Sequence, residues 1–140
     1  MTTLPWSHPC PDCGKRAHPV RVNLVRHHVK QPWTRNLEGH EFLFCETTGC
    51  DLVYFEVDGP SFTTADIRRP PAYKTGSPTD PLCYCFDASG DAVLRDPDPV
   101  PYISERVRKS ECACDVLNPS GDCCLGSIGF WRKARVTLSA

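Results

Sequence analysis

Ten cysteines in short pairs are the residues of this 140-residue chain that are most able to do chemistry. Four lie within the first 50 residues and six lie beyond residue 82, while residues 51–82 contain none. In a reducing compartment, closely spaced thiols bind metals rather than forming disulfides. The spacing therefore predicts two metal sites. The pairs are Cys10 and Cys13, Cys45 and Cys50, Cys83 and Cys85, Cys112 and Cys114, and Cys123 and Cys124.

The first four cysteines have the spacing of a structural zinc site. Cys10 and Cys13 form a Cys-x-x-Cys knuckle followed by Gly14, and Cys45 and Cys50 form the second pair. Two thiolate pairs suit the closed tetrahedral coordination of structural zinc, which leaves no open position for catalysis. The alternative is that a histidine replaces one of the thiols, and the five candidates are His8, His18, His27, His28 and His40.

The six later cysteines exceed what one zinc ion needs. Cys83 and Cys85 are separated by a single residue, which is tighter than a usual zinc knuckle. A Cys-x-Cys pair with a second pair much later in the chain suits a 2Fe–2S cluster, which takes four thiolates. A second zinc site is the alternative interpretation of the same spacing.

The charge balance and hydropathy exclude several classes of protein. The chain has sixteen basic and seventeen acidic residues. The sequence contains no dense basic segment that would argue for nucleic-acid binding. No apolar run approaches the roughly 20 residues that span a bilayer. The first residues lack the basic and apolar regions of a secretory signal. We therefore expect a cytoplasmic protein with no nucleic-acid partner and no membrane span.

The elements that position these cysteines can be predicted from local patterns. Apolar residues alternate at Val20, Val22 and Leu24, which is typical of a half-buried strand. Two further strands are predicted around the second zinc pair, and two helices in the later half. The strands are expected at residues 40–45 and 51–57, and the helices at residues 104–109 and 124–133.

These elements predict a small α+β fold. A zinc-pinned β-ribbon over residues 1–60 is followed by a Pro- and Gly-rich connection over residues 61–81. A mostly loop and helical unit over residues 82–140 then binds the cluster. The two units either stand apart or form one compact domain. The cysteine-free stretch between them leads us to expect independent metal sites.

Several strings of the sequence resemble the N-terminal domain of the archaeal CopZ-type copper chaperones. The resemblance covers about residues 8–130. It implies one zinc ion and one 2Fe–2S cluster, thought in that family to handle electrons for copper reduction. The strings are Cys10-Pro-Asp-Cys13-Gly14, Phe44-Cys45-Glu-Thr-Thr-Gly-Cys50, Cys83-Tyr-Cys85, and Asn118-Pro-Ser-Gly-Asp-Cys123-Cys124 together with Cys114.

The resemblance also implies which thiols bind which metal. Adjacent side chains diverge, so only one of Cys123 and Cys124 is expected to bind, and we predict Cys124. Cys112 has no counterpart in the family pattern and is an alternative to Cys114. The implied zinc ligands are Cys10, Cys13, Cys45 and Cys50, and the implied cluster ligands are Cys83, Cys85, Cys114 and Cys124.

One feature of the family is missing from this sequence. The chaperones bind Cu(I) through a Met-x-Cys-x-x-Cys loop in a second domain, whereas the only methionine here is Met1. We therefore expect a stand-alone chain without the Cu(I)-binding domain.

The expected function is single-electron transfer in copper homeostasis, for example the reduction of Cu(II) to Cu(I). Such a protein is an electron carrier rather than an enzyme with a substrate pocket. Its partner would be a copper chaperone, a copper-transport protein or another redox protein. The alternatives are an iron–sulfur assembly or delivery protein, and a zinc-only binding module.

Overall fold

The computed structural model describes residues 8–139, with side chains as far as Ala134. Its first half is a five-stranded antiparallel sheet in which the strands lie in sequence order. The two central strands bury every residue because they are covered on both faces. The strands are β1 (His8–Pro9), β2 (Arg16–Val20), β3 (Phe42–Cys45), β4 (Leu52–Phe55) and β5 (Ser61–Thr63).

The strand predicted at residues 20–24 is only partly correct. Val20 ends β2, but Val22 and Leu24 lie in helix α1 (Val22–His28). The helix buries Leu24, Val25 and His28, which share one face at helical spacing. The alternating apolar residues Val20, Val22 and Leu24 therefore belong partly to a helix with its 3.6-residue period, rather than to one strand. A 3₁₀ turn, η1 (Pro32–Thr34), follows before β3 begins.

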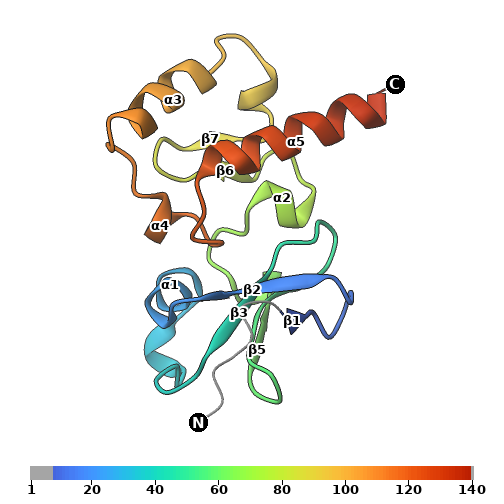
Figure 1. Cartoon of the computed structure of the whole chain (residues 1–140), viewed down its shortest axis with the longest axis vertical. Helices are drawn as coiled ribbons and strands as arrows, with labels where there is room; N and C mark the ends of the chain where they lie inside the picture. The colour runs from blue at the N-terminus through green and yellow to red at the C-terminus, as the bar shows by residue number, and fades with distance from the viewer. Residues whose placement is uncertain (1–7, 140) are drawn as a thin grey trace.

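The segment expected as a connection, residues 61–81, contains β5, a 3₁₀ turn η2 (Thr64–Asp66) and a short helix α2 (Ala72–Thr75). Strand β5 pairs with β4 and completes the sheet. Helix α2 is buried at Ala72, Tyr73 and Lys74. In Figure 1, α2 lies between the sheet and the C-terminal helices.

The later half combines a two-stranded ribbon with helices. The predicted helix at residues 104–109 extends further towards the N-terminus, because prolines occupy its first turn. The helix predicted to begin at residue 124 does so and continues to residue 139. The elements are β6 (Pro81–Cys83), β7 (Ala88–Ser89), η3 (Ala92–Leu94), α3 (Val100–Arg108), α4 (Cys114–Leu117) and α5 (Cys124–Ser139).

One hydrophobic core joins the two halves. It includes Phe44 and Tyr54 of the sheet together with Leu82, Ile103 and Trp131 of the later elements. The mixed α+β class predicted from the sequence is confirmed. The cysteine-free stretch contributes Phe62, Ile67 and Tyr73 to this core. No helix in the described part of the chain is long and apolar enough to cross a membrane.

Candidate metal centres

The first four cysteines converge at one end of the sheet. Cys10 and Cys13 flank the turn between β1 and β2, while Cys45 ends β3 and Cys50 precedes β4. All four sulfurs lie within 4.8 Å of one another. Cys10 Sγ is 3.9 Å from Cys50 Sγ, and Cys13 Sγ is 3.7 Å from Cys45 Sγ. Tetrahedral zinc with bonds of about 2.3 Å separates its sulfurs by about 3.8 Å, so the donor set fits this ion.

Two glycines shape the loops that carry these thiols. Gly14 adopts a φ of +77° and its N–H donates to Cys10 O at 2.8 Å, which closes the knuckle. Gly49, next to Cys50, adopts a φ of +86°. A residue with a Cβ is strained in this left-handed region. Each pair therefore depends on a glycine. Gly49 turns the chain just before the second thiol of its pair, and Gly14 turns the chain just after the second thiol of the other pair.

The surroundings lower the pKa of one of these thiols and raise the pKa of two others. The Thr47 hydroxyl lies 3.4 Å from Cys13 Sγ, and its hydrogen bond to the thiolate lowers the pKa of Cys13 to about 6. Burial instead raises the pKa of Cys10 to about 12 and raises the pKa of Cys50. A metal ion must therefore displace protons from the buried thiols when it binds.

A buried lysine braces this site, and sequence reasoning missed it. Lys74 in α2 is only 1% exposed. Its Nζ donates to Thr47 O at 3.0 Å and to Leu52 O at 2.7 Å, and its carbonyl accepts the Gly49 N–H at 2.9 Å. Lys74 therefore holds both ends of the loop around Cys50. The only hint in the sequence is a lysine in a segment of apolar residues and prolines.

The later cysteines form a second, more extended group. Cys124, at the start of α5, is 1% exposed, and its thiol interacts with both Cys83 and Cys114. Cys114 Sγ is also 3.8 Å from Cys85 Sγ, which accepts the Ala113 N–H at 3.1 Å. Among the four thiols predicted to bind the cluster, Cys85 and Cys114 are thus in sulfur contact and Cys124 interacts with Cys83 and Cys114, while their binding of a cluster stays a prediction.

The protons in this group are unevenly distributed. The hydrogen bond from Cys124 lowers the pKa of Cys114 to about 5 and that of Cys83 to about 7. The same hydrogen bonds, together with burial, raise the pKa of Cys124 itself. Burial raises the pKa of Cys85 to about 11. The backbone of Cys124 also contributes to lowering the pKa of Cys114.

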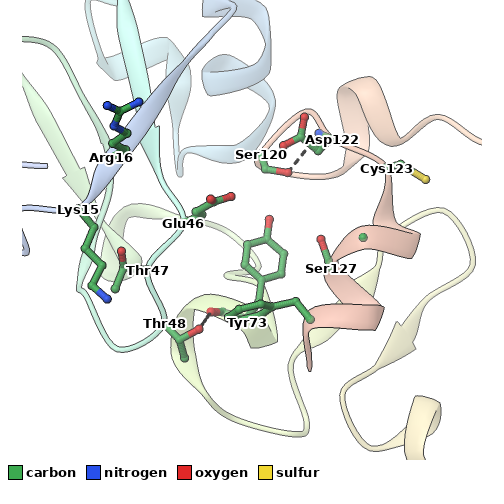
Figure 2. Close-up of a pocket in the computed structure, with 12 residues that line it drawn as sticks. Lys15, Arg16, Glu46, Thr47, Thr48, Tyr73, Ser120, Asp122, Cys123 and Ser127 are labelled. Atoms are coloured by element: carbon green, nitrogen blue, oxygen red, sulfur yellow. Dashed lines mark hydrogen bonds between the residues drawn. The ribbon is translucent and has the colours of Figure 1, made fainter. Parts of the chain in front are cut away.

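The two remaining thiols occupy the edge of this group. Cys112 is half-buried and interacts with Cys114. Cys123 is exposed and lines a cavity of about 670 Å³ between the sheet and α5, shown in Figure 2. In the described part of the chain, the later cysteines do not form a compact set whose sulfurs all lie within 4.8 Å of one another, as the first four do. Their arrangement therefore does not match a second single-ion site.

The first half of the chain anchors the loop that presents Cys124. Gly121 turns this loop with a φ of +78°, and Asn118 Nδ2 donates to Asp122 O at 2.9 Å. The contacts from the first half are His28 Nε2 to Val116 O (2.8 Å), Tyr73 OH to Asn118 Oδ1 (2.7 Å), Tyr54 OH to Pro119 O (2.5 Å) and His18 Nε2 to Ser120 O (3.1 Å). We call residues 116–122 the anchored loop. The later thiols are thus positioned partly by residues of the sheet, α1 and α2.

The histidines do not join the four zinc-site thiols. Among the described residues, the group whose donor atoms converge there consists of cysteines alone. His27 and His28 lie in α1 rather than on a strand, so His27 is exposed while His28 is buried. His40 Nδ1 pairs with Glu56 at 2.9 Å.

Comparisons with known proteins agree with this geometry. Residues 7–68 match the family model of the CopZ zinc-binding domain. The chain is 28% identical over 134 residues to the copper chaperone CopZ of Archaeoglobus fulgidus. That match covers 86% of this chain but 61% of the chaperone, so the chain spans about three fifths of its relative.

A solved structure shares the fold of nearly the whole chain. The X-ray structure of the A. fulgidus CopZ N-terminal domain aligns with a TM-score of 0.67 at 24% identity. The alignment covers 93% of this chain and 98% of that domain. This likeness shows that the chain shares the fold of that domain, and residues 7–68, which contain the four converging thiols, are similar to the family's zinc-binding domain.

Proposed function

We propose that this protein is a one-electron carrier of copper homeostasis, with a structural zinc and a 2Fe–2S cluster. The zinc ligands are Cys10, Cys13, Cys45 and Cys50, and the cluster ligands are Cys83, Cys85, Cys114 and Cys124. When bound, such a cluster accepts and releases single electrons. The copper assignment rests on the similarity to a copper chaperone. A copper chaperone or transport protein is the expected partner, in the reducing cytoplasm.

The arrangement of the later cysteines carries this proposal. Cys85 Sγ lies 3.8 Å from Cys114 Sγ and Cys124 interacts with Cys83 and Cys114, while among the described residues these sulfurs are more dispersed than those at the zinc site. Two irons need thiolates in two pairs, whereas one zinc ion needs four at a single centre. The donor set is also purely sulfur, which suits iron–sulfur chemistry.

The surrounding residues support a redox role. The N–H group of Ala113 donates to Cys85 Sγ at 3.1 Å, and such hydrogen bonds to sulfur tune reduction potentials. Cys83 and Cys124 are buried, so the group lies in low dielectric. Cys85 is only half-buried, which leaves a short path to a partner at the surface.

The first test is the metal content of the purified chain. We expect about two iron atoms, two sulfides and one zinc per chain, with a red-brown colour that bleaches on reduction. A colourless protein with one or two zinc ions would reject the carrier and favour the zinc-only module. Rapid transfer of the cluster to an apo-ferredoxin would favour a delivery protein instead.

The adjacent thiols Cys123 and Cys124 provide a matched pair of variants. We expect Cys124→Ser to lose or shift the visible spectrum, because its side chain faces Cys83 and Cys114. Cys123→Ser should keep the spectrum, because its side chain is exposed and belongs to the cavity wall. If Cys123→Ser bleaches the protein while Cys124→Ser stays coloured, the ligand assignment is reversed.

A further inference from the structure

A second type of donor cluster lies beside the cavity that Cys123 lines. His18, Glu46 and Asp122 place a ring nitrogen and two carboxylate oxygens within 4.8 Å of one another. His18 Nε2 is 3.7 Å from Asp122 Oδ2 and 3.1 Å from the carbonyl oxygen of Ser120. Three nitrogen and oxygen donors therefore converge at the junction of the sheet and the anchored loop, with the Ser120 carbonyl beside His18.

Separate elements hold these donors in place. His18 projects from β2, where it is paired with Phe44 and its ring packs on the Phe44 ring at 5.6 Å. Glu46 directly follows β3. Asp122 lies in the anchored loop, and its N–H is bound by the Ser120 hydroxyl at 3.1 Å. Figure 2 shows Glu46 extending towards the loop that carries Ser120 and Asp122.

Two carboxylates lie close together at this point, while Lys15 and Arg16 line other parts of the same cavity. Among the ion pairs of the described residues, neither Glu46 nor Asp122 is paired with a lysine or arginine, and Asp122 faces only His18. Two carboxylates so close together repel each other, and a divalent ion between them would neutralise both. Asp122 remains 67% exposed and His18 30% exposed, so an ion can enter from solvent.

We propose that His18, Glu46 and Asp122 bind a divalent transition-metal ion, with Cu(II) as the preferred ion. Imidazole and carboxylate donors suit Cu(II), and Cu(II) binds such sites most tightly among the first-row divalent ions. The Ser120 carbonyl is the fourth donor. When Nε2 binds the ion, the imidazole proton resides on Nδ1. The site is distinct from the thiolate site for zinc.

The location gives this site a role that rests on the proposed function. Asp122 is two residues before Cys124, so the same loop holds a copper donor and a proposed cluster ligand. A Cu(II) ion bound there would be the substrate of the electron carrier. An N/O site also holds Cu(I) less well than thiolates do, so the reduced ion would be released towards sulfur donors of a partner.

The test is a titration of the zinc-loaded, air-oxidised protein with one equivalent of Cu²⁺, followed by electron paramagnetic resonance. We expect one Cu²⁺ per chain with hyperfine coupling from a single imidazole nitrogen. His18→Gln should remove the nitrogen coupling, and Asp122→Asn should weaken binding at least about tenfold, since even groups outside the first ligand shell often matter this much. His27→Gln, at an exposed histidine of α1, should leave signal and affinity unchanged.

Several results would overturn the proposal. The first is that the wild-type protein binds no Cu²⁺, and the second is that its resonance signal shows thiolate ligation. The third is that the nitrogen coupling survives His18→Gln and is lost in His27→Gln. Asp122→Asn affects an exposed side chain, so it keeps the test valid if His18→Gln disturbs the sheet. The Cu²⁺ signal does not depend on iron content. A colourless protein with a His18-dependent signal would reject the electron carrier and retain this site.

Discussion

Removing one hydroxyl from the core should show how strongly the first half holds the anchored loop. Tyr54 is fully buried and its hydroxyl donates to Pro119 O at 2.5 Å. Burial raises the pKa of Tyr54 well above its usual range, so this group stays protonated and keeps donating. Tyr54→Phe preserves the ring and its packing. The change therefore isolates a single hydrogen bond between β4 and the loop.

The expected loss follows from the burial of both partners. Removing one partner of a buried hydrogen bond leaves the other unsatisfied and costs about 1–3 kcal/mol, towards the upper end where both partners are buried. Pro119 is buried, so its carbonyl has little access to water. We expect Tyr54→Phe to lower the free energy of unfolding by about 2–3 kcal/mol.

Urea unfolding of the zinc-loaded protein measures this loss as a lower midpoint with an unchanged slope. Tyr102→Phe is the matched control, because Tyr102 in α3 is 59% exposed. Its effect should stay within about 0.5 kcal/mol. If Tyr54→Phe behaves like this control, the loop is not held through Pro119. A broadened transition would instead mean that the two halves unfold separately.

Three further outcomes test other parts of the structure. Lys74→Met should weaken zinc binding about 10–100-fold in competition with a chelator, while Lys30→Met, at an exposed site, should not. Burial lowers the pKa of His28 to about 4 from an ordinary 6.5, so the unfolded chain takes up the proton first as pH falls. The free energy of unfolding should therefore drop by up to about 3 kcal/mol between pH 6.5 and 4. Unfolding curves of His28→Asn should lack that pH-dependent component. Replacing Cys10 and Cys13 together by serine should abolish the thermal transition, since structural zinc contributes on the order of 10 kcal/mol; a variant that loses zinc and keeps its transition would refute a structural role.

The sequence was most informative where local spacing determines structure. The Cys-x-x-Cys knuckle with Gly14 needs only a tight turn to bring its thiols together, and the structure brings them together with Cys45 and Cys50. The buried strands β3 and β4 were evident as short apolar runs. The start of α5 at Cys124 followed from the preceding Gly-Asp. Each of these features depends on neighbours within a few residues.

Features that depend on distant residues could not be predicted in the same way. Lys74 can brace the zinc site only because the carbonyl groups of Thr47 and Leu52 accept hydrogen bonds from its Nζ. The donors His18, Glu46 and Asp122 come from three separate segments and form no motif along the chain. The cysteine-free stretch indicated a spacer by composition, yet tertiary packing buries it. Sequence spacing alone also placed part of α1 on a strand, because three residues are too few to distinguish the two periods.

The anchored loop also has a consequence for how the protein is made. The four zinc-site thiols lie within residues 10–50 and leave the ribosome well before the later cysteines, and N-terminal regions generally fold first. Tyr54 and Tyr73, two of the side chains that hold the loop, also precede the later cysteines along the chain. We therefore expect zinc to bind first, and the later half of the chain to fold correctly only after zinc has bound. A cell short of zinc would then accumulate nascent chains that cannot present Cys124 correctly, however much iron it holds.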